Sequence, residues 1–259
     1  MIFGCCIKKA EDVVRVREAG YDYFEFSAAA LAQMSQEEFQ ALGQAMIAAQ
    51  LPCFGFNSYS SGNPAIVGED FSPYAAQEYA ERICEGAYML GAQTIGIGSP
   101  KARRLPEGYP RPRADAQLRE FLGITVNVAK EYGLWLMLEP LHDKCCNYVN
   151  TVSEALELLR AMEIKGVGLV LDFYHMQVMG EGLDMIAKAA PYLLHTHISS
   201  CGPNLERGFP GMEDLQHYRE IISALRAVGY DASLSVEPDA FDAEKAAECL
   251  RMLREAAGE

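Results

Sequence analysis

The stretch LWLMLE at residues 134–139 is a short apolar run that ends in a carboxylate. Three later stretches are similar, namely VGLVLD at 167–172, LLHTH at 193–197 and LSVE at 234–237. A short, nearly continuous apolar run is typical of a buried parallel strand. Parallel barrels carry their functional side chains at the C-terminal ends of such strands. The candidate functional residues are therefore Glu139, Asp172, His197 and Glu237.

Strand-like runs alternate with helix-like segments along the whole chain. The expected strands are 2–7, 23–27, 52–58, 94–98, 135–139, 167–172, 193–198 and 233–237, and the expected helices are 11–19, 36–49, 73–90, 113–132, 152–162, 183–189, 214–228 and 242–257. Repeated strand–helix units form parallel sheets. Eight such units in 259 residues, without a linker or a shift in composition, predict a single α/β domain, a (β/α)8 TIM barrel over residues 1–259.

The connections that follow the expected strands are long, and those that precede them are short. The long ones are 58–72, 99–112, 140–150, 173–182 and 199–213, which places the elaborated loops around the candidate residues. The second of these loops contains Lys101, Arg103 and Arg104. This positive charge predicts a site for a substrate phosphate or carboxylate, although a solvated loop explains it equally well.

Composition excludes several classes of protein. The formal charge of −14 opposes binding to a nucleic-acid backbone, which needs clustered basic residues. No apolar stretch approaches the ~20 residues that span a membrane, and the N-terminus lacks the pattern of a signal peptide. The eight cysteines form no CxxC motif, so reduced thiols are expected. Together these features predict a cytoplasmic enzyme with no nucleic-acid or membrane partner.

Three carboxylates and one imidazole at neighbouring strand ends suit one divalent cation. Oxygen-rich sets with a histidine favour Mn2+, Co2+ or Mg2+, with Zn2+ also compatible. Taken singly, each residue has a simpler explanation. Asp172 alone would be a helix cap, and His197 alone would be a core histidine. Four such residues on successive strands are harder to explain separately, so we predict a metal site formed by all of them.

Short motifs support this interpretation. The strings LEPL at 138–141, LDFYHM at 171–176, HTH at 195–197 with RGFPG at 207–211, and VEP at 236–238 resemble the xylose isomerase-like sugar phosphate isomerase/epimerase superfamily, nearest the ketose 3-epimerase branch. The resemblance implies metal binding by the four candidates. It also implies proton transfer by Glu139 and Glu237 through a metal-stabilised cis-enediolate of a small carbohydrate. His175 and Arg207 would contact substrate oxygens, and the resemblance further implies a homo-oligomer.

The chain departs from the ketose 3-epimerases close to the first candidate ligand. Cys145 stands where those enzymes carry a second glutamate, and His142-Asp143 replaces an Asn-Arg pair. His142 and Cys145 therefore become candidate specificity residues, and free tagatose or psicose is expected to be a poor substrate. Asn57, at the end of the third expected strand, is a candidate pocket residue.

Two further residues are open to more than one interpretation. Glu25, assigned to the end of the second strand, is either a substrate contact or an inert cap. His195 lies on the same side of its strand as His197 and either orients that ligand or only packs.

Other functions remain compatible with the same barrel. A metal-dependent dehydratase, similar to inosose or dehydroshikimate dehydratases, would use the same ligands and then expel a hydroxyl group. An abasic-site nuclease needs further histidines at early strand ends, but all five histidines follow position 140. A non-catalytic sugar-binding barrel would have no need for the complete ligand set. The sequence therefore favours an isomerase or epimerase, with the dehydratase as the alternative.

Overall fold

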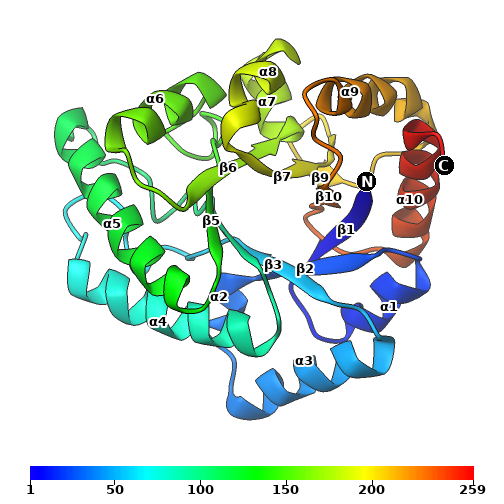
Figure 1. Ribbon diagram of the computed structural model, residues 1–259, viewed down its shortest axis with the longest axis horizontal. Helices are drawn as coiled ribbons and strands as arrows, with labels where there is room; N and C mark the ends of the chain where they lie inside the picture. Colours follow the sequence, from blue (N-terminus) through cyan, green and yellow to red (C-terminus); the bar gives the residue numbers. More distant parts are fainter.

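Eight parallel strands close into a barrel in the computed structural model, which describes residues 1–259 (Figure 1). Each strand pairs with the next along the chain, and the last, β10, pairs with the first, so the two ends of the chain lie near each other. The (β/α)8 prediction is confirmed. The barrel strands are β1 (Ile2–Ile7), β2 (Tyr23–Ser27), β3 (Cys53–Asn57), β4 (Thr94–Ile97), β5 (Trp135–Leu138), β6 (Val167–Asp172), β7 (Leu193–Ile198) and β10 (Ser233–Val236).

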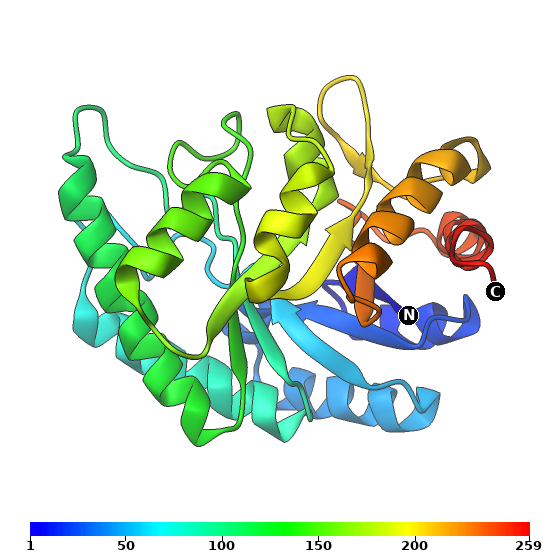
Figure 2. The same ribbon diagram turned by 45° about the horizontal axis from the view of Figure 1, so that its top comes forward.

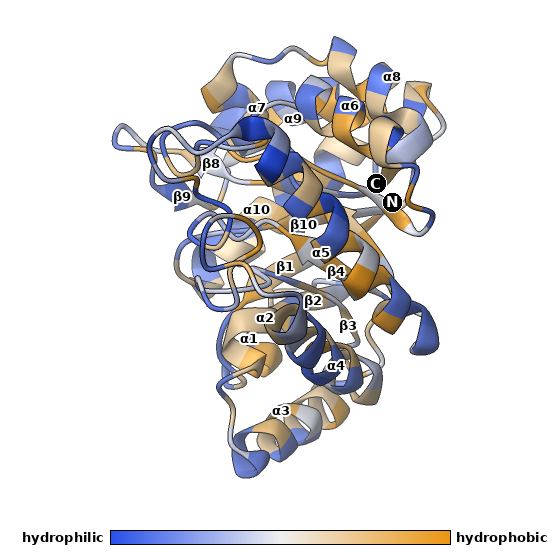
Figure 3. Ribbon diagram, turned by 90° about the vertical axis from the view of Figure 1, so that its left-hand side faces the viewer, coloured by the Kyte–Doolittle hydropathy of each residue, from blue (hydrophilic) through white to orange (hydrophobic).

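Helices surround the barrel and carry the chain from each strand to the next. They are α1 (Asp12–Glu18), α3 (Gln36–Ala49), α4 (Pro73–Met89), α5 (Arg111–Glu131), α6 (Val152–Met162), α8 (Asp184–Ala189), α9 (Leu215–Ala227) and α10 (Ala243–Ala257). Hydrophilic and hydrophobic positions alternate along helices such as α4 and α5, as expected for helices with one face on a core (Figure 3). None of the helices combines the length and the apolar composition needed to cross a lipid bilayer.

Local signals explain where several helices begin. Ser35 accepts a hydrogen bond from the Glu38 amide while the Glu38 side chain bonds back to the Ser35 amide, a complete capping box. Ser72 caps α4, which starts with Pro73. Thr151 caps α6, but the Glu154 side chain bonds to the Asn150 amide instead, so only half of the second box forms. The expected boundaries differ from the observed ones by at most two residues, which is the usual uncertainty at frayed ends.

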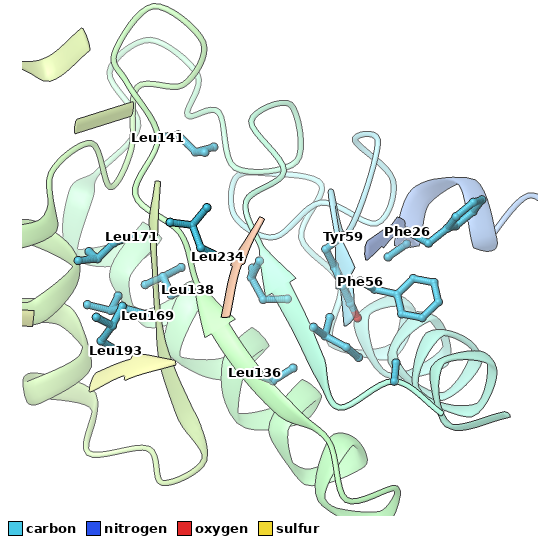
Figure 4. Close-up of a cluster of buried hydrophobic side chains, with 14 of the residues drawn as sticks. Phe26, Phe56, Tyr59, Leu136, Leu138, Leu141, Leu169, Leu171, Leu193 and Leu234 are labelled. Carbon is cyan, nitrogen blue, oxygen red and sulfur yellow. The ribbon is translucent and has the colours of Figure 1, made fainter. Parts of the chain in front are cut away.

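Side chains along each strand point alternately outward, to the apolar layer beneath the helices, and inward, to the barrel interior. In β6, Leu169 and Leu171 pack in the layer between strands and helices, beside Leu138 and Leu193 (Figure 4). Successive side chains of a strand point to opposite faces, so Val170 and Asp172 lie on the interior side. Burying each of these leucines contributes roughly 2 kcal/mol. The apolar packing outside the barrel thus determines which polar residues point into it.

Several short elements lie in segments expected to be loops. The 173–182 connection contains α7 (Phe173–Met179), capped by Asp172 and ended by Gly180 in a left-handed conformation with φ 70°. The 199–213 connection contains a hairpin of β8 (Ser200–Cys201) and β9 (Arg207–Gly208). Short helices also occur as α2 (Ala28–Leu31), η1 (Ala190–Tyr192) and η2 (Met212–Asp214). The long loops gather at one end of the barrel, at the top of Figure 2.

Candidate metal and substrate site

Four consecutive barrel strands bring the predicted ligands together. Asp172 ends β6 and His197 lies near the end of β7, while Glu139 and Glu237 directly follow β5 and β10. One donor atom from each residue lies within 4.8 Å of the others. His197 Nδ1 lies 3.4 Å from Glu139 Oε1 and 3.6 Å from Glu237 Oε2.

Two atoms of this cluster are buried without a hydrogen-bond partner. They are Glu139 Oε1 and His197 Nδ1, which face each other. Buried polar atoms are nearly always satisfied, so an orphan pair needs an explanation. A divalent cation bound by both atoms would satisfy them, and three carboxylates with one imidazole are a donor set that such cations accept. The residues present therefore fit a metal ion.

Arg207 forms ion pairs with two of the candidate ligands, Asp172 and Glu237. Its Nη2 group donates to Asp172 Oδ2 at 2.7 Å and lies 2.8 Å from Glu237 Oε2. Its Nε atom donates to the Glu237 carbonyl, and its guanidinium lies 4.6 Å from the centre of the Tyr174 ring. The β8–β9 hairpin places this arginine, which is therefore a residue of the site and not a solvated loop charge.

The charged groups of the cluster shift one another's ionisation. Burial opposes ionisation of Asp172, but Arg207 and His175 outweigh it and hold the pKa of Asp172 well below its usual range. Burial raises the pKa of Glu237 to about 7, although Arg207 and His197 act in the opposite direction. Burial also lowers the pKa of His175 to about 4. At neutral pH, Asp172 is therefore ionised, His175 is neutral, and Glu237 lies near its midpoint.

A cavity of about 460 Å³ opens directly over the cluster. This volume is in the range of small-molecule sites. His142, Cys145, His175 and Arg207 all line it, together with Ser58, Ser99, Pro100, Glu139, Leu141, Lys144, Tyr174, Leu205, Glu237 and Asp239. Asn57 does not line the cavity; its Nδ2 group donates to Glu237 Oε1 at 2.9 Å and so supports a candidate ligand.

Backbone amides orient the two histidines of the cavity wall. The His142 amide donates to His175 Nδ1 at 3.2 Å, and the amides of Lys144 and Cys145 donate to His142 Nδ1 at 3.2 and 3.3 Å. Both rings therefore carry their proton on Nε2. The Cys145 thiol donates to the His142 carbonyl, and burial raises its pKa to about 11, so it stays neutral. The Cys145 thiol therefore presents a neutral group to the cavity.

The basic loop does not form an anion site over the cavity. Arg103 is fully buried and donates to the carbonyls of Ile97 and Glu139, at 3.4 and 2.8 Å. Arg104 donates to the Cys145 carbonyl, and Lys101 does not line the cavity. The expectation of an anion site was wrong, and Arg103 is not a solvated loop charge either, because backbone carbonyls at the end of β4 and just after β5 accept hydrogen bonds from its guanidinium group. Arg103 instead positions the backbone of Glu139.

Glu25 is the residue whose location the sequence least anticipated. It lies in the middle of β2, not at its end, and is fully buried. Its Oε1 atom lies 2.7 Å from His195 Nε2 and 3.1 Å from His197 Nε2. It is therefore neither a cap nor a residue of the cavity lining. The sequence did offer a signal, because Glu25 is the one carboxylate in the aromatic strand YFEFS. A carboxylate buried in such a strand is unfavourable unless it has a hydrogen-bond partner.

Gly98 leaves space for a candidate ligand, because a Cβ at this position would collide with Glu139 Oε2. The Gly98→Ala variant is expected to fold, since the displaced atom ends a flexible side chain, but to bind metal at least about tenfold more weakly. Titration with Mn2+ would measure the change. Gly123→Ala on α5 is the matched control, because no atom lies within 4 Å of its Cβ position. Unchanged affinity in Gly98→Ala would argue against Glu139 as a ligand.

Two known proteins are similar to parts of this chain. An inosose isomerase of Halalkalibacterium halodurans is 31% identical over 119 residues, covering 42% of this chain and 41% of the relative. A probable ketose 3-epimerase of Synechocystis sp. is 27% identical over 178 residues, covering 68% and 60%. The matched segments thus span less than two thirds of either relative.

The fold has a close counterpart among solved structures. The crystal structure of D-psicose 3-epimerase in the presence of D-fructose matches 100% of both chains with a TM-score of 0.84, at 21% identity. The sequence model of the xylose isomerase-like TIM barrel matches residues 13–256. The predicted resemblance is confirmed, and the chain belongs to the xylose isomerase-like TIM barrel family.

Proposed function

We propose that this protein is a divalent-metal-dependent isomerase or epimerase of a small carbohydrate. The observation that carries the proposal is the orphan pair of Glu139 Oε1 and His197 Nδ1, buried 3.4 Å apart within a cluster of three carboxylates and an imidazole. Glu139, Asp172, His197 and Glu237 would hold the cation. Mn2+, Co2+ and Mg2+ suit this donor set best, and Zn2+ is also compatible.

The chain's own residues support proton transfer beside a carbonyl. A bound cation would supply a Lewis acid that polarises the substrate carbonyl. Glu139 and Glu237 are the outer members of the four-strand arc, so they reach a substrate from two sides. One would remove a proton from the carbon next to the carbonyl, and the other would return a proton. A carboxylate can both accept and return a proton, so either glutamate can take either role.

The cavity wall would hold the substrate's oxygens. His175 and Arg207 lie side by side, with Nε2 of the histidine 3.3 Å from Nη1 of the arginine, and both groups can donate to one oxygen. His142 and Cys145 form the neighbouring wall and are the proposed specificity residues. Because Cys145 cannot accept hydrogen bonds as a carboxylate does, free tagatose and psicose remain expected to be poor substrates.

Metal binding tests the proposal directly. The purified protein is expected to bind about one Mn2+, Co2+, Mg2+ or Zn2+ per chain by elemental analysis, and both Glu139→Gln and His197→Ala are expected to abolish tight binding. The cation needs the ionised Glu237, so protons compete with it below pH 7. Affinity should therefore fall by about tenfold per pH unit for each displaced proton. Failure to bind any of these cations would refute the proposal.

Product analysis separates the isomerase from a dehydratase. Metal-loaded protein incubated with ketoses and inososes in D2O is expected to exchange a carbon-bound proton and to yield an isomer of the same mass. Loss of water, seen as a mass decrease or as a conjugated chromophore, would instead indicate a dehydratase. The two outcomes are distinguishable by mass spectrometry of a single reaction.

A further inference from the structure

A buried hydrogen-bonded chain of side chains ends at the candidate metal ligand His197, and none of its members lines the cavity. It joins Ser233, His195, Glu25 and His197, all of which are buried. Ser233 Oγ lies 2.7 Å from His195 Nδ1, and His195 Nε2 lies 2.7 Å from Glu25 Oε1. His197 Nε2 lies 3.1 and 3.3 Å from the two Glu25 oxygens. Glu25 is thus the single carboxylate shared by His195 and His197, the two histidines of the His-Thr-His string.

The chemistry of these groups assigns every proton in the chain. One oxygen of Glu25 lies within hydrogen-bond distance of the Nε2 atoms of both His195 and His197, and a carboxylate oxygen shared by two imidazoles can only accept. The Nε2 atoms of both histidines must therefore be the donors. His195 Nδ1 then accepts from the Ser233 hydroxyl. For His197, a proton on Nε2 leaves the lone pair of Nδ1 free whenever the ring is neutral.

The free lone pair points at the place where a cation would bind. His197 Nδ1 faces Glu139 Oε1 and Glu237 Oε2 and has no hydrogen-bond partner. Histidines that bind metals almost always donate their other ring N–H to a carboxylate, carbonyl or water, which fixes both the tautomer and the ring orientation. Glu25 supplies that acceptor from β2, on the far side of the barrel interior from β6.

We propose that Glu25 is the positioning residue for the metal ligand His197, and that His195 and Ser233 hold Glu25 in place. This inference rests on the proposed function, because it assigns Glu25 a role in metal affinity. A solely structural layer would be more stable with an apolar side chain here, since burying a carboxylate costs several kcal/mol. The charge is explained by the need to hold one imidazole nitrogen protonated and the other free.

Glu25→Gln removes the carboxylate that accepts the hydrogen bond from His197 Nε2. Its amide group has one acceptor oxygen and one donating nitrogen, so it no longer enforces an Nε2 proton on His197. The affinity for Mn2+, measured by competition with a fluorescent chelator, is expected to fall by about 10- to 100-fold. Glu25→Asp retains the charge and is expected to recover part of the affinity. The matched control is Ser235→Ala, a buried interior residue that pairs with His197 in register but bonds to Tyr23.

The tautomer provides a second measurement that does not depend on the variants folding. In wild-type protein labelled with 15N-histidine, two-bond 15N–1H spectra of the Mn2+-free, Zn2+-loaded form should show His197 protonated on Nε2 and bound through Nδ1. A proton on Nδ1 would overturn the proposal, as would a Glu25→Gln affinity within twofold of the wild-type value. If wild-type protein binds metal but Glu25→Gln is unaffected, only this inference fails. If the wild type binds no metal, the proposed function fails with it.

Discussion

Replacing Glu237 by glutamine is expected to lower substrate proton exchange by about 100- to 10,000-fold while the protein remains folded. The amide cannot accept a proton at neutral pH. Its oxygen can still accept the hydrogen bond from Asn57 and contact a cation, more weakly than the carboxylate does, so exchange is compared at saturating metal concentration. The chemistry should therefore fall much further than metal occupancy. The same argument applies to Glu139→Gln at saturating metal concentration, although its metal affinity is lower from the outset.

The measurement is deuterium incorporation into ketoses and inososes in D2O, followed by NMR, with metal content determined on the same samples. Glu157→Gln, on the exposed face of α6, is the matched control, because it removes a carboxylate far from the cavity lining. Wild-type exchange rates in a fully metal-loaded Glu237→Gln variant would rule out Glu237 as an acid or base. Loss of exchange only in proportion to lost metal would make it a ligand alone.

Replacing Arg207 by methionine is expected to destabilise the metal-free protein by about 3 kcal/mol, in the range measured when one partner of a buried ion pair is removed. Arg207 is the cation that neutralises Asp172 and Glu237 in the metal-free site, at 2.7 and 2.8 Å, and Asp172 is buried. Without it, these carboxylates repel each other in a poorly solvated environment. A divalent cation replaces the missing charge, so metal should restore much of the lost stability.

Urea unfolding with a chelator, and again with saturating Mn2+, would measure both effects. Because Arg207 occupies oxygens that the cation needs, Arg207→Met is also expected to bind Mn2+ at least as tightly as wild type, while losing substrate turnover. Arg219→Met is the matched control, since its ion pair with Glu255 is exposed and should contribute at most about 1 kcal/mol. Equal destabilisation of Arg207→Met with and without metal would contradict this account.

The barrel and its strand ends could be predicted because both depend on local patterns. Apolar runs of strand length, helical periodicity and caps such as Ser35 and Ser72 located the eight strand–helix units to within two residues. Closure of the barrel then places the ends of consecutive strands together. For this reason, Glu139, Asp172, His197 and Glu237 could be assigned to one cluster from the order of their strands alone.

The short elements over the site could not be predicted in the same way. Helix α7 has only seven residues, and the β8–β9 hairpin has two residues in each strand. Elements this short are unstable in isolation and form because the barrel beneath packs against them. Their sequences therefore resemble loops. The structure alone placed Arg207 on Asp172, 35 positions away, and turned the basic loop inward through Arg103.

Hydrophobic periodicity along the chain was enough to predict the barrel and the four residues at its mouth, and short motifs were enough to predict the family. The contacts of Glu25 with both His195 and His197, and of Arg207 with the site carboxylates, were visible only in the folded structure. These contacts join residues separated by 30 to 172 positions. Because these contacts are buried, water does not compete for them. They form only when the closed barrel brings the distant residues together, so no local pattern predicts them.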